Sequence, residues 1–104
     1  MANPQIVSLE ASGTSDGLAI DTAVFADGIG LVVGLSDGAA AEYTIQCSGD
    51  RVDTPDDDKL WVNLPLLVGK TTALTSNLEY PVTSVRLNVA SLAGRIQLAV
   101  VYAR

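Results

Sequence analysis

Residues 27–50 read DGIGLVVGLSDGAAAEYTIQCSGD. This stretch contains an apolar run over Ile29–Leu35 and an alternating run over Ala41–Cys47, with Asp37 and Gly38 between them. An apolar run of this length favours a strand buried on both faces, and alternation favours a strand with one buried face. Asp-Gly supplies the positive φ angles that tight turns require. The stretch therefore predicts two neighbouring β-strands joined by a short hairpin turn.

The same dipeptide punctuates the whole first half of the chain. Asp-Gly occurs in steps of 11 and 10 residues, and a reversed pair follows 12 residues later: Asp16-Gly17, Asp27-Gly28, Asp37-Gly38 and Gly49-Asp50. Turn residues at intervals of about 8–12 are typical of all-β sandwiches and barrels. No segment shows a helical period with capping residues. We therefore predict an all-β, antiparallel β-sandwich of about eight strands, forming one domain over residues 1–104 with residues 1–4 as a flexible arm.

The remaining strands are predicted from apolar runs and alternation. Residues 12–17 and 49–59 read as loops. Because proline cannot donate to a ladder, the segment around Pro65 is either an edge strand or an extended segment outside the sheet. The expected segments are 5–11, one or two strands within 18–25, 60–68, 71–74, 82–89 and 95–102. The last two form the clearest pair, a closing hairpin with a turn at 90–94. Its expected inner face is Val85, Leu87, Val89, Ile96, Leu98 and Val100.

The composition leaves more apolar residues than a small core can hold. Hydrophobic residues make up 48% of the 104 residues and charged residues 17%, while a domain of this size has a high ratio of surface to volume. Both sides of residues 31–35 and 96–101 are uncharged. The fraction could be merely average, raised by Ala and Val. We favour the alternative that part of the surface is covered by another protein, and expect a homo-oligomer.

Charge is unevenly distributed along the chain. Residues 1–50 contain seven acidic side chains and no Lys or Arg, whereas residues 51–104 contain five acids and six bases. This argues against nucleic acid as a partner, and we expect the acids to keep the protein soluble. No signal-peptide or transmembrane pattern is present, so we expect synthesis in a cytoplasm and no membrane. Cys47 has no partner for an intramolecular disulfide and is expected to be buried.

No catalytic motif emerges from the sequence. The chain has no His, which removes the commonest general base and the usual nucleophile pairs. The tripeptide Gly69-Lys70-Thr71 lacks the preceding glycine of a phosphate-binding loop, because Leu64 stands at that position. We therefore expect a protein that is not an enzyme and that has no cofactor and no small-molecule substrate.

Two features remain as candidate sites. Clustered carboxylates on a loop are ligands that Ca²⁺ uses, and the candidates are Asp53, Asp56, Asp57 and Asp58. Their spacing does not match an EF-hand, so a solvated acidic loop is the favoured interpretation. Trp61 is either a core residue or an anchor at a subunit interface, where a large rigid ring fills a pocket. The candidate interface residues are Trp61, Leu64, Leu66 and Leu67.

The C-terminal third resembles a known group of proteins. The stretch Tyr80-Pro-Val-Thr-Ser-Val-Arg-Leu-Asn-Val89, followed by Arg95-Ile-Gln-Leu-Ala-Val-Val-Tyr102, resembles the closing hairpin of small β-sandwich virion proteins of tailed bacteriophages. Among these proteins, the chain is most similar in size and in its lack of catalytic motifs to the capsid decoration, or cement, proteins. The resemblance covers about 25 residues and implies a jelly-roll-like sandwich, commonly trimeric, on the capsid exterior. There it would bridge subunits of the major capsid protein.

Three functions compete at this point. The first is the capsid decoration subunit, located on the virion. The second is a carbohydrate- or receptor-binding module of a phage tail or fibre, which needs exposed aromatic rings, and the chain has only one Trp, three Tyr and one Phe. The third, an enzyme, lacks recognisable residues.

Overall fold

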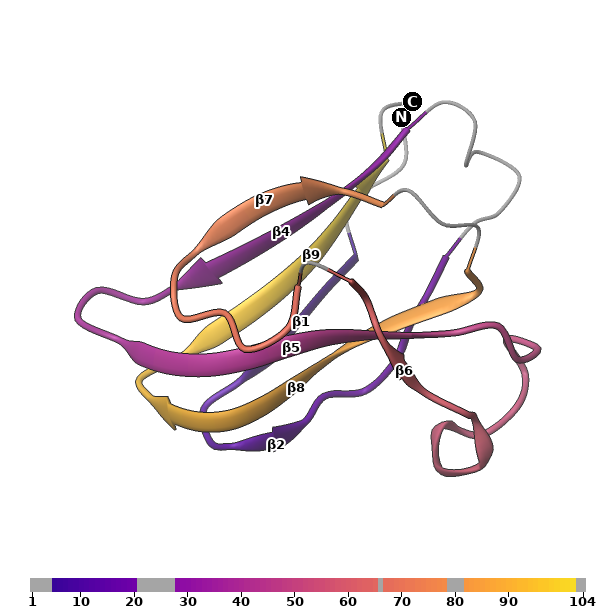
Figure 1. The fold of residues 1–104 in the computed structure, drawn as a ribbon, viewed down its shortest axis with the longest axis horizontal. Coiled ribbons are helices and arrows are strands. Elements are labelled where there is room, and N and C mark those ends of the chain that lie inside the picture. Colours follow the sequence, from indigo (N-terminus) through magenta and orange to yellow (C-terminus); the bar gives the residue numbers. More distant parts are fainter. Residues whose placement is uncertain (1–4, 21–27, 66, 79–81, 103–104) are drawn as a thin grey trace.

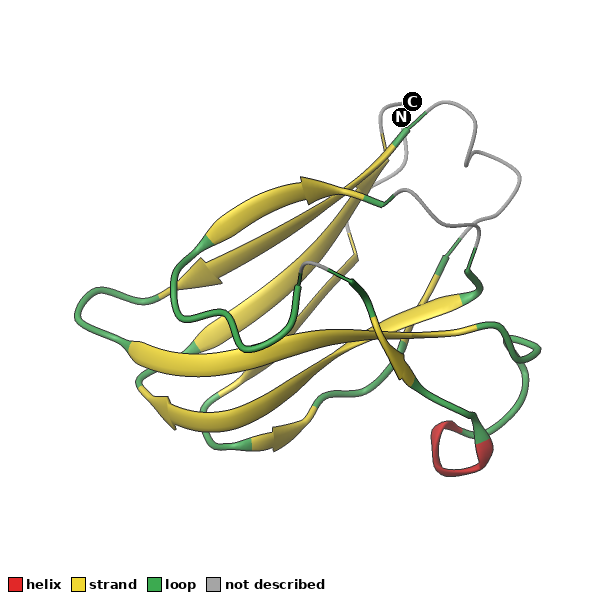
Figure 2. Ribbon diagram, viewed as in Figure 1, coloured by secondary structure: helices red, strands yellow, loops and turns green. Residues whose placement is uncertain are grey.

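The computed structural model describes residues 5–20, 28–65, 67–78 and 82–102. Nine strands form two antiparallel sheets that pack face to face (Figure 1). Sheet A contains, in spatial order, β1 (Gln5–Leu9), β9 (Ile96–Tyr102), β4 (Ile29–Leu35) and β7 (Leu74–Asn77). Sheet B contains, in spatial order, β2 (Gly13–Thr14), β8 (Ser84–Ala93), β5 (Ala40–Ser48) and β6 (Val62–Asn63), and β3 (Leu18–Ala19) also pairs with β8. The described residues form one helical turn, at Asp56–Asp58 (Figure 2).

The strand order is that of a jelly roll. Because β2 and β3 both pair with β8 through neighbouring stretches of chain, they occupy one strand position, and nine strands fill eight positions. Numbered by position, the sheets have the orders 1-8-3-6 and 2-7-4-5. Most connections therefore cross from one sheet to the other, as in the two Greek keys of a jelly roll. The predicted antiparallel sandwich of about eight strands is confirmed.

The predicted hairpins are wrong, although the strands are not. Residues 84–93 and 96–102 form β8 and β9, which belong to different sheets, and strand β8 continues past the predicted turn to Ala93. The turn at Asp37 and Gly38 likewise joins β4 of sheet A to β5 of sheet B. Alternation shows which side chains point inward, and it does so equally for a hairpin and for an arch between sheets. Sequence patterns alone therefore could not choose the pairing partner.

Two connections between the sheets, β4–β5 and β8–β9, lie in close contact. Gly94, between β8 and β9, has a φ of 106°. A side chain there would place its Cβ 2.6 Å from the Cβ of Ala39, which lies in the β4–β5 arch. Glycine is required at this position both by the backbone angle and by the space.

Several boundaries differ from the prediction. Residues 12–17, predicted as a loop, contain β2, and the strand predicted at 71–74 lies at Leu74–Asn77. The edge position of β6 is confirmed, as is the irregular segment at 49–59 apart from its helical turn. The arm at 1–4 and most of the predicted strand region 18–25 lie outside the described residues.

The core lies between the two sheets. The predicted inner face is confirmed, since all six side chains are buried in one cluster: Val85, Leu87, Val89, Ile96, Leu98 and Val100. Cys47 is also buried, and burial raises the pKa of its thiol. The Tyr43 hydroxyl donates to the Thr72 carbonyl at 2.7 Å, and burial raises the pKa of Tyr43 to about 12. The phenol therefore stays neutral and anchors the β6–β7 connection to the core.

Candidate functional site

The carboxylates of the acidic loop do not converge on one point. Asp53 forms an exposed ion pair with Arg51 at 3.1 Å, Asp56 turns toward Lys59, and Asp57 and Asp58 are exposed on the helical turn. Within the described ranges no three acidic, Cys or His side chains come close enough together to hold a metal ion. The four candidate ligands therefore point to different partners.

Asp56 instead fastens the loop to a distant turn. Its carboxylate accepts a hydrogen bond from the backbone N–H of Gly17 at 2.8 Å and one from the Lys59 ammonium at 3.0 Å. The Gly17 hydrogen bond and then the Lys59 contacts hold the pKa of Asp56 below its ordinary value. The Lys59 side chain is 5% exposed, so its charge is nearly withdrawn from water beside this carboxylate. Asp56 therefore links its loop to the turn at Gly17, 39 residues away in the sequence. We call the group of contacts among Gly17, Asp56, Trp61 and Arg86 the clasp.

Trp61 lies outside the buried core, and its ring packs against charged side chains of the same chain. Its half-buried ring lies against the Arg86 guanidinium, 4.3 Å from the ring centroid, and the Lys59 ammonium lies 5.8 Å away. The indole N–H donates to the carbonyl of Asp56 at 3.1 Å. At Gly17 a Cβ would come within 3.0 Å of this ring. Trp61 thus completes the clasp, held by cation–π contact with the sheet.

The leucines of the candidate interface have different positions. Leu64 and Leu67 are buried in the core, at 2% and 8% exposure, so their side chains pack within this chain. Leu66 lies outside the described residues. The apolar character of this segment is therefore explained at two of its positions by the core.

The outer face of sheet B is polar. Gln46 accepts a hydrogen bond from Arg86 Nε at 2.8 Å and donates one to the side chain of Asn63 at 3.2 Å. These three residues lie on β5, β8 and β6 and form a ladder across the sheet, with Trp61 stacked at Arg86. The side chains of Gln46, Asn63 and Arg86 therefore find hydrogen-bond partners within this face.

The outer face of sheet A is uncharged across all four strands. The register places Ile6, Ala99, Val32 and Thr75 in one row from β1 to β7. The neighbouring positions on the same face are also uncharged: Ser8, Gln97, Gly34, Val101, Gly30 and Asn77. Ile6 is 55% exposed and Val101 38%. We call these ten residues the sheet A face.

The sheet A face is also shallowly hollowed. Gly30 has no side chain, and a depression of about 330 Å³ is lined there by Gly28, Val32, Asn77 and Val101 among others. A second depression of about 220 Å³ lies on the β7 side of the same glycine. Both depressions are lined by uncharged residues.

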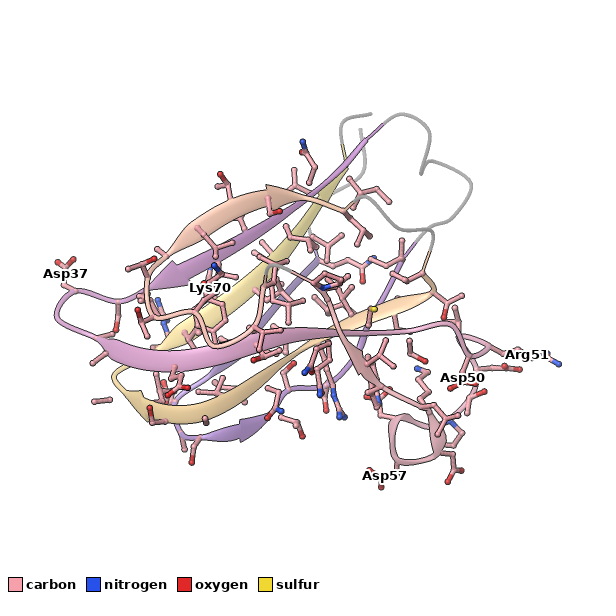
Figure 3. The ribbon with its side chains drawn as sticks, viewed as in Figure 1. Asp37, Asp50, Arg51, Asp57 and Lys70 are labelled. Atoms are coloured by element: carbon pink, nitrogen blue, oxygen red, sulfur yellow. The ribbon has the colours of Figure 1, made fainter. Side chains whose placement is uncertain are left out.

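Charged side chains lie mostly outside the sheet A face. Figure 3 shows Asp37 at the β4–β5 turn at one end of the molecule and Asp50, Arg51 and Asp57 at the other end. Within the described part of residues 1–50, Asp50 is half-buried and four acidic side chains are exposed: Glu10, Asp16, Asp37 and Glu42. The four exposed acids face solvent, as expected, and the charged residue beside the sheet A face is Arg95, which lines a depression with Gly34 and Gln97 at one end of it.

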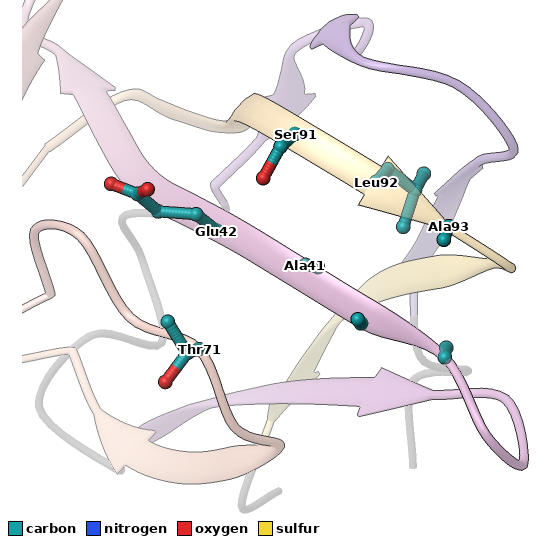
Figure 4. A pocket seen from close by; sticks show the side chains of 8 residues that line it. Ala41, Glu42, Thr71, Ser91, Leu92 and Ala93 are labelled. Atoms are coloured by element: carbon teal, nitrogen blue, oxygen red, sulfur yellow. The ribbon is translucent and has the colours of Figure 1, made fainter.

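A further groove lies beside β5 on sheet B. This groove of about 580 Å³ lies at the Ala40 end of β5 and is lined mostly by small side chains (Figure 4). Its polar side chains are the Glu42 carboxylate and the hydroxyls of Thr71 and Ser91. The sequence has no His to act as base beside a hydroxyl. No helix within the described ranges is long and apolar enough to cross a bilayer.

Comparison of the chain with family models, with curated proteins and with solved structures finds no match.

Sequence reasoning missed the clasp of Gly17, Asp56, Trp61 and Arg86. Asp16-Gly17 was interpreted as a turn signal, yet Gly17 is needed because Asp56 and Trp61 occupy the space of a side chain. No local pattern links residues 39 positions apart. The sheet A face, by contrast, is visible in the sequence as alternating Gly30, Val32 and Gly34 opposite apolar inner residues.

Proposed function

We propose that this protein is a structural virion protein, a decoration or cement subunit that binds the exterior of a phage capsid. It stabilises the capsid by bridging neighbouring subunits of the major capsid protein. It is made in the host cytoplasm, assembles as a homo-oligomer with the trimer as the expected form, and acts without a cofactor, nucleic acid, membrane or small-molecule substrate.

The observation that carries the proposal is the sheet A face. An uncharged surface that spans four strands can be buried against another protein without the cost of desolvating charges. A jelly roll leaves one face of each sheet outside the core, and here the two outer faces differ in kind. Sheet B carries polar side chains that hydrogen-bond to one another, whereas sheet A presents Ile6, Val32 and Val101 around the buried Ala99.

Two further arguments support the same function. The C-terminal third resembles virion β-sandwich proteins in sequence, although its two strands pair with other strands and not with each other. Jelly rolls are frequent among viral capsid and lectin domains, which is an argument by analogy of fold. The lectin-like alternative has less support, because the ring of Trp61 already stacks on Arg86.

The test is co-sedimentation with empty capsids assembled from the major capsid protein encoded nearest to this gene. Wild-type protein should sediment with these capsids and raise their melting temperature. Val101→Glu, which places a charge on the sheet A face, should weaken binding at least about tenfold, since a carboxylate there would have to be desolvated. Thr14→Glu is the matched control, because Thr14 is exposed on sheet B, and it should bind as the wild type does.

Two results would count against the proposal. Wild-type protein that stays in the supernatant over the whole concentration range would remove the capsid as a partner. If Thr14→Glu weakens capsid binding more than Val101→Glu does, the contact lies on sheet B and not on sheet A.

A further inference from the structure

Three of the four sheet edges carry features that hinder pairing with another chain. At the edge of sheet A formed by β1, the Gln5 side chain donates to the Ala19 carbonyl of β3 at 3.0 Å. In sheet B, β6 is two residues long and Pro65 follows it closely, while β2 and β3 are two-residue pieces separated by the 15–17 turn. Short pieces, proline and flanking chain are the usual protections of edge strands.

The β7 edge lacks such protection apart from its modest length. Residues 71–78 contain no charged side chain and no proline, and the β4–β7 register is regular over its four pairs. No strand of the described chain pairs with the far side of β7 (Figure 1). The adjoining surface is the uncharged sheet A face, so an approaching chain meets no charge from Gly30, Val32 or Ala99.

The hydrogen-bonding pattern shows which backbone groups the edge presents. Leu78 N–H donates to the Ile29 carbonyl at 2.8 Å, so Ile29 and Leu78 form a hydrogen-bonded pair. Because such pairs alternate in antiparallel ladders, Ser76 also bonds to β4, whereas Thr75 and Asn77 direct their N–H and C=O groups away from it. The Asn77 carbonyl accepts from the Ser76 hydroxyl at 3.4 Å and keeps a second lone pair.

We propose that β7 pairs antiparallel with β7 of a second copy of this chain about a two-fold axis through Ser76. Thr75 of each copy then lies opposite Asn77 of the other, and the two pairs form about four backbone hydrogen bonds. The edge is its own complement, because the same two residues supply donors and acceptors at the same spacing on both copies. Sheet A becomes a continuous sheet across the two molecules.

A second copy suits this edge because the two-fold pairing uses the same two residues, Thr75 and Asn77, on both chains. Each molecule carries a formal charge of −6, so an uncharged edge is a surface where two copies repel each other least. This contact goes beyond the proposed capsid binding, since it needs no capsid and leaves the sheet A face open. In a decorated lattice it would link neighbouring decoration oligomers to each other.

The contact is small, and its measurement must allow for that. A four-residue edge buries much less than the ~1,200 Å² of a stable interface, so association should be visible between about 10 and 500 µM. Sedimentation equilibrium of the wild type should show the average mass rising toward twice its low-concentration value. The ratio of masses is decisive, because a two-fold contact through one β7 edge doubles the mass of a monomer, whereas a trimer with three such edges reaches at least twice its mass.

Thr75→Pro is the sharpest variant. Its N–H does not donate to β4, so proline removes only the outward donor and leaves the β4–β7 ladder intact. Its average mass should stay constant over the same range. Thr75→Val keeps the N–H and should associate as the wild type does. If Thr75→Pro melts earlier than the wild type, Thr75→Lys replaces it, since a lysine on the edge opposes pairing while retaining the N–H.

Amide hydrogen exchange at both concentrations locates the contact. Exchange at Thr75 and Asn77 should slow at least about threefold at the higher concentration, by mass action. A wild-type mass that does not rise, or that rises equally in Thr75→Lys, would overturn the proposal. Protection that appears on β1 as well would replace the two-fold pairing by a β7-to-β1 contact. None of these outcomes depends on capsid binding, so the two proposals fail separately.

Discussion

Replacing Leu87 with alanine should lower the free energy of unfolding by about 3–4 kcal/mol. Leu87 is 0% exposed and pairs with Ile45 on the central strand β5 of sheet B. The change removes three carbon atoms at about 0.8 kcal/mol each, which gives about 2.4 kcal/mol of lost transfer free energy. The remaining ~1 kcal/mol comes from the cavity, because β8 is held by strands on both sides and cannot move in to fill it.

Urea unfolding followed by circular dichroism measures this loss. With a slope of about 1–3 kcal/mol per molar urea, the midpoint should fall by about 1–4 M. Leu60→Ala is the matched control, since Leu60 is 79% exposed, and it should cost less than about 0.5 kcal/mol. A loss below about 1 kcal/mol at Leu87, or one equal to that of the control, would refute the assignment of the inner face of β8.

Two further predictions concern the acidic loop. Asp56→Asn should cost about 1 kcal/mol at neutral pH, because the amide can still accept from Gly17 but leaves the Lys59 charge without its partner. Because the pKa of Asp56 is lowered in the folded protein, the carboxylate contributes fully to the free energy of unfolding above the unfolded pKa of about 4. That contribution is lost as the pH falls through the folded pKa, so the stabilities of wild type and variant should converge in acid. A difference in stability that grows in acid would contradict this. Millimolar Ca²⁺ should leave the melting temperature unchanged, since the four carboxylates diverge; a rise of several degrees that Asp57→Asn abolishes would show a cation site after all.

The parts of the fold that could be predicted are those that a period of two determines. Val85, Leu87 and Val89 are buried because alternate side chains share a face, and that holds whichever strand lies beside them. The sequence also shows that both sides of residues 31–35 and 96–101 are uncharged, and the register assigns Val32 to the outer face. The partner of each strand could not be predicted, because the five residues 90–94 look alike in a hairpin turn and in the end of a strand.

The clasp shows a second limit of sequence reasoning. Asp56 was weighed as a metal ligand because three acids stand in a row, and its partner Gly17 lies in another loop. Likewise Trp61 was weighed as core or anchor, while its position depends on Arg86 of β8. Contacts of this kind depend on how the two loops meet after the sheets have formed, and no local pattern carries that information.

Electron cryo-microscopy of capsids decorated with this protein tests the central claim most directly. The account predicts that the sheet A face, including Ile6, Ala99 and Val101, lies against the capsid shell, with the acidic turn at Asp37 in solvent. A decorated map in which the polar outer face of sheet B contacts the shell, with the sheet A face open to water, would contradict it.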